Sequence, residues 1–374
     1  MPKKRTIEIP RFIKIENKIA GRIKRVLRGY GLRYRRIVLF TGPRNGTTHK
    51  LAQKFLERSL LENTICIEIE PRLKCRNSVY NVKRLSMNRW LKNADLLIGF
   101  GGCGVLDVVK HIAFNKGIDY LLVPTTVSND GIASPIAVII NSKGIPISHF
   151  TKPPLGIFLE LDILNKSSKE MILSGTGDLL SNISAVKDWE LAHRKVKERM
   201  DDFAKLISIA SANFVHERMD ELTEDPEFVF NPQFIKNLVY GLVLSGLSMA
   251  VYGTSRPSSG SEHKFYHSLN RLYKKKDIPH GIQVAIGMIY AEYLRRQNYF
   301  LTYVRLFKAL GIPLSSQQIK KAYGLKKEEL IRALAGSVQI RKGKRYTIFE
   351  EKKLDLKKAK KIVNDIDRIV SLAG

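Results

Sequence analysis

Short apolar runs alternate with amphipathic helical patterns through the first 160 residues, and this alternation limits the possible folds more than any other feature. The runs are rich in Ile, Leu and Val, which is typical of strands buried on both faces of a parallel sheet. We expect strands at 36–42, 64–70, 95–100 and 120–126. Helical patterns occupy the intervals 48–61, 81–93 and 101–114.

Beyond the apolar run 156–164 the pattern becomes helical throughout, and a chain of 374 residues is long enough for two domains. The predicted fold is therefore α/β, with an N-terminal Rossmann-like nucleotide-binding domain at 1–162 and an all-helical domain at 163–374. Within the second domain we expect helices at 169–196, 201–218, 233–252, 261–275 and 281–297. The apolar stretch 237–253 approaches the length of a membrane span, but its serines, tyrosines and glycines favour a buried core helix.

A formal net charge of +29 is the most unusual global property, and the basic residues concentrate towards both ends of the chain. No nucleic-acid-binding module accompanies them, so we interpret the charge as a solvated surface or one suited to anionic substrates. Contact with nucleic acid or an anionic membrane surface is the alternative. Three cysteines without a CxxC pair and an N-terminus without an apolar signal segment favour a cytoplasmic protein.

Three of the eight histidines fall within residues 259–281 and are candidates for metal ligands. His263 and His267 would share one face of a helix, because they are four residues apart. His280 follows a proline and precedes a glycine, which predicts the start of another helix. Imidazole is a common zinc or iron ligand, but a stable site usually needs a carboxylate or thiolate as well.

Asp178 is the best-placed carboxylate, although a position after two glycines at a predicted helix start also fits an ordinary N-cap. If the helical domain folds back on itself, Asp178 and two histidines would form a three-ligand site with an open position. Such sites are typical of catalytic metals.

Two segments at strand ends have the composition of nucleotide-binding turns. Gly99, Gly101, Gly102 and Gly104 lie between a strand and a helix, where glycines let a backbone approach phosphates. Their spacing differs from the dinucleotide GxGxxG motif and follows the third predicted strand. In the second segment, 123–135, hydroxyl side chains could donate to a pyrophosphate or a ring amide, and Asp130 lies in a turn that it could simply cap.

Four segments in the same order resemble the archaeal sn-glycerol-1-phosphate dehydrogenases: "GFGGCGVLDVVKHIA", "VPTTVSNDGIASP", "GTGDLLSNISAVKDWELAHR" and "SRPSSGSEHKFYH…HG". That family belongs to a superfamily with glycerol dehydrogenase, iron-type alcohol dehydrogenases and 3-dehydroquinate synthase. The resemblance extends from "IEIPR" near the start to "RYTIFEE" near the end, and four motifs in register are more specific than one.

The resemblance implies a role for each candidate residue of the helical domain. Zinc would be held by Asp178, His263 and His280, while Asp130, Asp178 and His267 would contact the substrate and take part in catalysis. Iron-type relatives carry a fourth ligand, a histidine, where this chain has Asn182, and this difference favours zinc over iron.

The resemblance also implies a cofactor site for NADPH or NADH, formed by Gly101, Gly102, Cys103, Gly104, Val105, Thr125, Thr126, Val127, Ser128 and Ser134. Asp107 and Lys110 would support the glycine loop. Arg44, after the first strand, would lie near an adenine-ribose 2′-phosphate or remain a solvated loop residue. Cys103 in place of a glycine, Asn129 in place of a histidine and Ile282 in place of a glutamate depart from the family pattern.

The implied reaction is NAD(P)H-dependent reduction of dihydroxyacetone phosphate to sn-glycerol 1-phosphate, which supplies the backbone of archaeal membrane lipids. A homo-oligomer is expected. The alternatives are a glycerol or other polyol(-phosphate) dehydrogenase of the same superfamily, or a basic protein that binds nucleic acid or a membrane surface without turnover.

Overall fold

The computed structural model describes residues 6–59, 61, 63–71, 76–273, 278–296 and 299–372. Cys75 and the predicted helix ends at 275 and 297 lie outside these residues. The chain forms two compact units: an N-terminal unit, Met1–Val127 with Gly131–Ser167, and a helical unit, Ser128–Asp130 with Ser168–Gly374. The predicted boundary between 162 and 163 falls inside a short helix, α5 (Leu161–Leu164).

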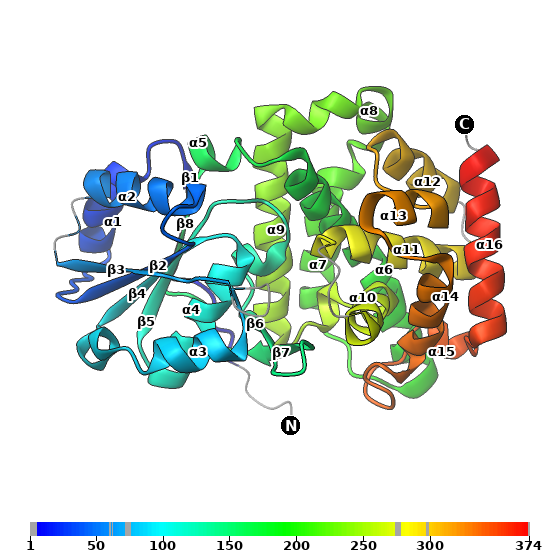
Figure 1. Cartoon of the computed structure of the whole chain (residues 1–374), viewed down its shortest axis with the longest axis horizontal. Helices are drawn as coiled ribbons and strands as arrows, with labels where there is room; N and C mark the ends of the chain where they lie inside the picture. Colours follow the sequence, from blue (N-terminus) through cyan, green and yellow to red (C-terminus); the bar gives the residue numbers. More distant parts are fainter. Residues whose placement is uncertain are drawn as a thin grey trace. The chain divides into compact units, whose positions relative to one another are not determined.

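A six-stranded parallel sheet forms the centre of the N-terminal unit, with strand order β1-β8-β5-β4-β2-β3 (Figure 1). Its strands are β1 (Phe12–Glu16), β2 (Ile37–Thr41), β3 (Thr64–Glu68), β4 (Leu96–Gly101), β5 (Asp119–Pro124) and β8 (Gly156–Glu160). A separate antiparallel pair consists of β6 (Ile136–Ile140) and β7 (Pro146–Phe150). The predicted α/β class with a parallel sheet is confirmed.

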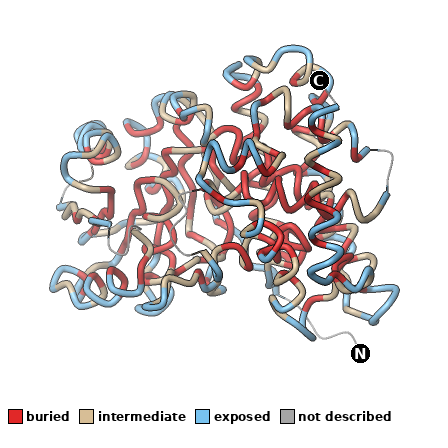
Figure 2. The backbone as a smooth tube through the Cα atoms, turned by 45° about the vertical axis from the view of Figure 1, so that its right-hand side comes forward, coloured by how far each residue is buried: buried red, intermediate tan, exposed pale blue. Residues whose placement is uncertain are grey.

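Strands β2, β4 and β8 are buried along their whole length, as their largely apolar sequences predict. Figure 2 shows buried stretches of backbone in red. Alternate residues of neighbouring strands, such as Leu39, Ile98 and Leu121, share one core cluster. The helices of this unit are α1 (Ile23–Gly29), α2 (Thr47–Ser59), α3 (Val79–Ser86), α4 (Cys103–Lys116) and α5.

Some elements of the N-terminal unit differ from the prediction or lay outside it. The prediction of one helix over 81–93 is wrong in its second half. Helix α3 ends at Ser86, and a 3-10 helix, Arg89–Asn93, follows. Its cause is Asn88, whose side chain accepts a hydrogen bond from the Trp90 N–H and so begins a new turn. Strands β1, β6 and β7 were not predicted. The sequences of β1 and β7 mix polar with apolar residues. Strand β6 is a continuous apolar run, IAVII, but it pairs with β7 instead of joining the parallel sheet.

The helical unit contains no strand among its described residues. Its helices are α6 (Lys169–Val196), α7 (Asp202–His216), α8 (Met219–Glu224), α9 (Pro232–Tyr252), α10 (Ser261–Leu272), α11 (His280–Arg295), α12 (Phe300–Ala309), α13 (Ser316–Tyr323), α14 (Lys327–Gly336), α15 (Ile348–Glu351) and α16 (Leu356–Leu372). Helix α9 is long and apolar enough to cross a membrane, but 67% of its most apolar window is buried inside the protein. This burial fits the predicted core helix, which packs against α7 and α6.

Helices α6 and α11 approach so closely that only glycine fits at their contact. A Cβ atom on Gly281 would lie 1.7 Å from the Ser174 carbonyl oxygen, and one on Gly177 would lie 2.6 Å from the Gly281 carbonyl oxygen. The Gly281 N–H also donates to the Ser174 hydroxyl at 3.0 Å. The contact fixes the first turn of α11, which begins at His280 as predicted.

Replacing Gly281 with alanine should therefore destabilise the helical unit, because the added methyl group meets backbone rather than a movable side chain. We expect a loss of about 3 kcal/mol in the free energy of unfolding, measured by urea denaturation of metal-free protein. Gly29→Ala is the control, because a Cβ at Gly29 has no neighbour within 4 Å. Equal stability of the two variants would contradict the close packing.

Candidate active site

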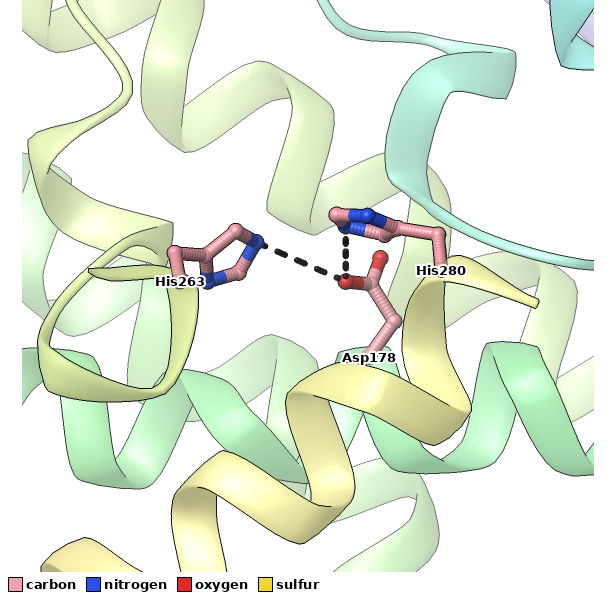
Figure 3. A group of neighbouring side chains, drawn as sticks. All are labelled: Asp178, His263 and His280. Atoms are coloured by element: carbon pink, nitrogen blue, oxygen red, sulfur yellow. Dashed lines mark ion pairs between the residues drawn. The ribbon is translucent and has the colours of Figure 1, made fainter. Parts of the chain in front are cut away.

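Three side chains from three helices of the helical unit form one cluster of potential metal ligands (Figure 3). Asp178 comes from α6, His263 from α10 and His280 from the first turn of α11. Their ligand atoms all lie within 4.8 Å of one another. The Asp178 Oδ1 atom is 3.2 Å from His280 Nε2 and 3.8 Å from His263 Nε2.

The position of Asp178 differs from an N-cap, the alternative that its sequence context offered. Asp178 lies in the interior of α6, which begins at Lys169, and only 3% of its surface is exposed. The preceding glycine, Gly177, is a packing position against α11 instead of a helix start. Asp178 is therefore held rigidly by a long helix.

The cluster fits a tetrahedral metal such as zinc. Bonds of about 2.0–2.1 Å in a tetrahedral site place ligand atoms roughly 3.3 Å apart. The two separations from Asp178 Oδ1, 3.2 Å to His280 and 3.8 Å to His263, are near this value. Burial alone would raise the pKa of Asp178, but a hydrogen bond from His280 and the charges of His280 and His263 lower it below its ordinary value. The carboxylate is thus the favoured form beside a cation. Two imidazole nitrogens and one carboxylate oxygen leave one tetrahedral position for another ligand.

Neighbouring groups orient the ligands. His263 Nδ1 lies 3.1 Å from the buried Glu262 carboxylate, and the tautomer that donates there leaves the Nε2 lone pair directed at the cluster. The second oxygen of Asp178 accepts a hydrogen bond from the Asp130 N–H at 3.0 Å. Asp130 therefore lies beside the cluster, and its own carboxylate accepts a hydrogen bond from Ser245 at 2.8 Å.

Asn182, one helical turn beyond Asp178, is engaged elsewhere. Its amide nitrogen donates to the hydroxyls of Ser211 at 2.8 Å and Ser245 at 2.9 Å. Asn182 therefore belongs to a hydrogen-bond network with these two serines.

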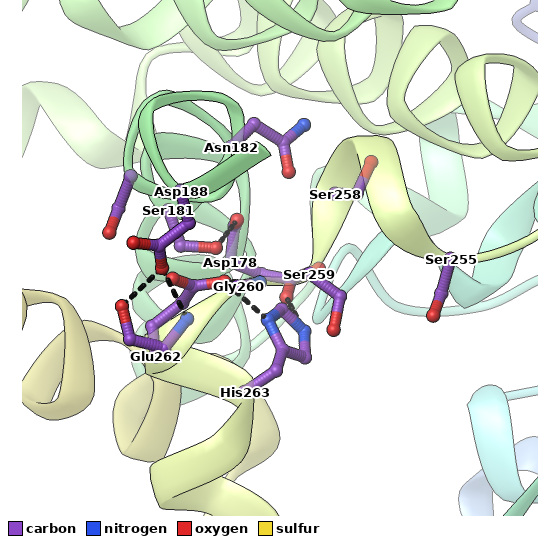
Figure 4. A network of polar contacts seen from close by, with 12 residues as sticks. Asp178, Ser181, Asn182, Asp188, Ser255, Ser258, Ser259, Gly260, Glu262 and His263 are labelled. Carbon is purple, nitrogen blue, oxygen red and sulfur yellow. Dashed lines mark hydrogen bonds and ion pairs between the residues drawn. The ribbon is translucent and has the colours of Figure 1, made fainter. Parts of the chain in front are cut away.

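Sequence reasoning missed Asp188, a fully buried carboxylate that fixes the start of α10 (Figure 4). Its Oδ2 atom accepts hydrogen bonds from the Ser261 N–H at 2.7 Å and from the Ser261 hydroxyl. Its Oδ1 atom accepts from the Ile348 N–H at 2.8 Å and pairs with Arg295. Because α10 carries His263, Asp188 helps to position His263 in the cluster. The available signal was its location ten residues after Asp178 in the same predicted helix.

Asp188→Asn should weaken both folding and metal binding. The substitution removes the charge that pairs with buried Arg295, for which we expect a loss of about 3 kcal/mol in unfolding free energy. A shifted α10 should lower zinc affinity by roughly 10-fold or more, since groups that orient ligands act on this scale. Both quantities can be measured, by denaturation and by competition with a chelating dye. An unchanged zinc affinity would show that Asp188 serves stability alone.

His267 lies one turn after His263 on α10, on the same helix face as predicted. Burial, followed by the charge of Arg341, lowers the pKa of His267 well below its ordinary value. The imidazole is therefore neutral at physiological pH. A neutral imidazole both donates and accepts a hydrogen bond, which suits contact with a substrate hydroxyl.

The predicted cofactor residues of the N-terminal unit gather at the ends of two paired strands. Strand β4 ends at Gly101, which pairs with Pro124 at the end of β5. Gly102 is the N-cap of α4 without a side-chain capping bond, so the first N–H groups of a helix face this edge. A Cβ on Gly102 would meet the Thr126 hydroxyl at 3.5 Å. The glycine loop and the threonine segment are therefore adjacent.

Other predicted residues of this region have more defined contacts. The Lys110 amino group donates to the carbonyls of Gly131 at 2.6 Å and Ile136 at 3.0 Å, and it lies 3.8 Å from Asp107. Lys110 is fully buried and so supports the segment after the threonines. Ser134 is buried in the N-terminal unit, whereas Ser128 belongs to the helical unit and accepts a hydrogen bond from Ser174. Arg44 is exposed in the loop after β2.

The fold is that of two-domain dehydrogenases. A probable glycerol dehydrogenase from Sinorhizobium meliloti 1021 is similar with a TM-score of 0.76 at 16% identity, over 98% of this chain and 99% of the other. Glycerol dehydrogenase from Schizosaccharomyces pombe is similar with a TM-score of 0.75 at 16% identity, over 99% and 92%. Residues 14–167 match the iron-containing alcohol dehydrogenase family.

Sequence relatives narrow this class. The chain is 32% identical to glycerol-1-phosphate dehydrogenase [NAD(P)+] of Archaeoglobus fulgidus over 92% of this chain and 94% of the relative. It is 34% identical to the protein of that name from Staphylothermus marinus, over 87% of each chain. The chain belongs to the glycerol-1-phosphate dehydrogenase family, as the four sequence motifs predicted.

Proposed function

We propose that this protein is an NAD(P)-dependent oxidoreductase that reduces dihydroxyacetone phosphate to sn-glycerol 1-phosphate. The buried cluster of Asp178, His263 and His280, with its open fourth position, carries the proposal. In the reaction a hydride from NADPH or NADH and one proton convert the ketone to a secondary alcohol, and the cofactor leaves oxidised. The product fits the name that the relatives bear and would supply the backbone of archaeal membrane lipids.

The donor set supports zinc as the bound ion, held by Asp178, His263 and His280. A zinc ion supplies Lewis-acid polarisation of a carbonyl at such a site. Asp130 would contact the substrate and, through its N–H, orient Asp178. Neutral His267 would hydrogen-bond a substrate hydroxyl and relay the proton through it or through water.

The glycine loop Gly101–Val105 and the segment Thr125–Ser128, with Ser134, would bind the dinucleotide. The start of α4 suits a pyrophosphate, and the two threonines suit the nicotinamide side. Exposed Arg44 would add affinity for a 2′-phosphate and thus for NADPH. The enzyme would act as a homo-oligomer in the cytoplasm, in keeping with a sequence of three cysteines that contains no CxxC pair. Its basic surface would suit anionic substrates or brief contact with anionic membranes.

The experiment follows NADPH and NADH oxidation by zinc-loaded protein with dihydroxyacetone phosphate or unphosphorylated dihydroxyacetone, and assigns the product by an enantiomer-specific assay. We expect faster turnover of dihydroxyacetone phosphate than of dihydroxyacetone, with sn-glycerol 1-phosphate as the product. Preference for dihydroxyacetone would point to a glycerol or polyol dehydrogenase. Absence of turnover combined with salt-sensitive binding of nucleic acid or anionic vesicles would favour a basic binding protein.

A further inference from the structure

Two arginines from one loop converge on a single serine near the metal-ligand cluster, within the helical unit. Arg341 Nη1 and Arg345 Nη2 each donate to the Ser255 hydroxyl at 3.3 Å. Arg345 Nη1 also donates to the Ser259 hydroxyl at 2.6 Å and to its carbonyl at 2.8 Å. Two guanidinium groups around one hydroxyl form a cationic cradle, which we define as Arg341, Arg345, Ser255 and Ser259.

The cradle holds more positive charge than its neighbours balance. Among the described residues, the recorded ion pairs join the adjacent Arg256 to Glu198 but include none for Arg341 or Arg345. Burial and the charge of Arg256 lower the pKa of Arg341. Burial and the charges of Arg341 and Arg256 also lower the pKa of Arg345, and this effect outweighs the opposite effect of Glu198 and Glu262. Buried charges in proteins are normally paired, so the cradle has the electrostatics of an anion site.

The backbone of the loop is also held in a costly conformation. Arg341 has a φ of 50°, in the left-handed region that non-glycine residues seldom occupy. Residues kept in such conformations are concentrated at ligand-binding sites. The neighbouring Lys342 and Lys344 are exposed, whereas the Arg345 side chain is turned inward with 7% of its surface exposed.

The cradle adjoins the candidate active site. Ser259 lies beside His263 in Figure 4, and α10 begins two residues later at Ser261. The charges of Arg341 and Arg345 both act on His267, one turn further along α10. The two guanidinium groups can therefore offset a negative charge placed beside the candidate active site.

We propose that Arg341 and Arg345, with the hydroxyls of Ser255 and Ser259, bind the phosphate group of the substrate. This inference rests on the proposed function and names the part of the site that selects a phosphorylated ketone. Guanidinium groups suit a phosphate because their N–H donors match its oxygens in pairs. In dihydroxyacetone phosphate only a methylene and an ester oxygen separate the carbonyl from the phosphate, so the phosphate site must adjoin the metal cluster.

Arg341→Asn tests the proposal, with Lys342→Asn as the matched control in the same loop. Asparagine tolerates a positive φ, and both variants lose one positive charge. We expect Arg341→Asn to lower kcat/KM for dihydroxyacetone phosphate about 30- to 100-fold while leaving that for dihydroxyacetone within about twofold. We also expect inorganic phosphate to raise the unfolding temperature of the unmodified protein. This rise should be smaller in Arg341→Asn and unchanged in Lys342→Asn.

The outcomes separate this inference from the proposed function. If the unmodified protein fails to reduce dihydroxyacetone phosphate but its stabilisation by phosphate depends on Arg341, the proposed function fails and the anion site stands. If turnover occurs and the two variants behave alike, the phosphate site is overturned. Arg345→Lys, which keeps the charge and loses the paired donors, should reproduce the selective loss for the phosphorylated ketone.

Discussion

Asp178→Asn should abolish zinc binding and lower kcat/KM for dihydroxyacetone phosphate by about 1,000-fold or more, the largest effect expected for a single substitution in this protein. Asparagine has the same shape and can still accept the hydrogen bond from the Asp130 N–H. It lacks the charge that balances a divalent cation between His263 and His280. Loss of Lewis-acid polarisation is worth several kcal/mol at the transition state, with each 1.36 kcal/mol equal to about tenfold.

Zinc content by elemental analysis and NADPH oxidation should therefore fall together in Asp178→Asn. Asp202→Asn provides the control. Asp202 is an exposed residue of the same unit that pairs with Lys205, so its substitution removes an equal charge without altering the metal-ligand cluster. His263→Ala should match Asp178→Asn in both measurements. Zinc at full occupancy in either variant would refute the assigned ligand set. Reconstitution of the metal-depleted protein with zinc or ferrous iron, in parallel, tests the preference for zinc.

His267→Ala should lower kcat/KM by about 100- to 1,000-fold and leave the zinc content unchanged, which distinguishes a substrate-facing histidine from a ligand. Positioned acid–base groups contribute about this much to catalysis. His267 lies outside the group of potential ligands found among the described residues, although it shares α10 with His263. Steady-state kinetics and elemental analysis on the same preparation provide the two readouts.

His267→Gln is the companion variant for this prediction. Glutamine keeps a side chain that donates and accepts hydrogen bonds, but it cannot move a proton in the way imidazole does. If His267 only positions the substrate, glutamine should restore most of the activity that alanine loses. If it relays the proton, both variants should lower kcat while KM changes little. Loss of zinc in either variant would place His267 in the metal shell, against the proposed role.

Five helices of the second unit were predicted because each carries a long periodic pattern, whereas α8 and α12 to α16 were not predicted. The predicted intervals 169–196, 233–252 and 261–275 correspond to α6, α9 and α10. Short elements with mixed sequences were harder to predict. Strand β1 alternates apolar residues with lysine and glutamate, and the turn at Asn88 depends on one side-chain hydrogen bond.

The sequence by itself determined the parallel sheet, five of the helices in the second unit, the family and the three potential ligands, because these follow from periodicity and from motifs of fixed spacing. The tertiary structure alone decided what surrounds those ligands. Asp188 meets Ser261 and Ile348 across 73 and 160 residues of sequence, and Arg341 meets Ser255 across 86. Such contacts leave no local sequence pattern, since the residues around each partner reflect only the helix or loop in which that partner lies. They arise when the helices pack and bury their charges together.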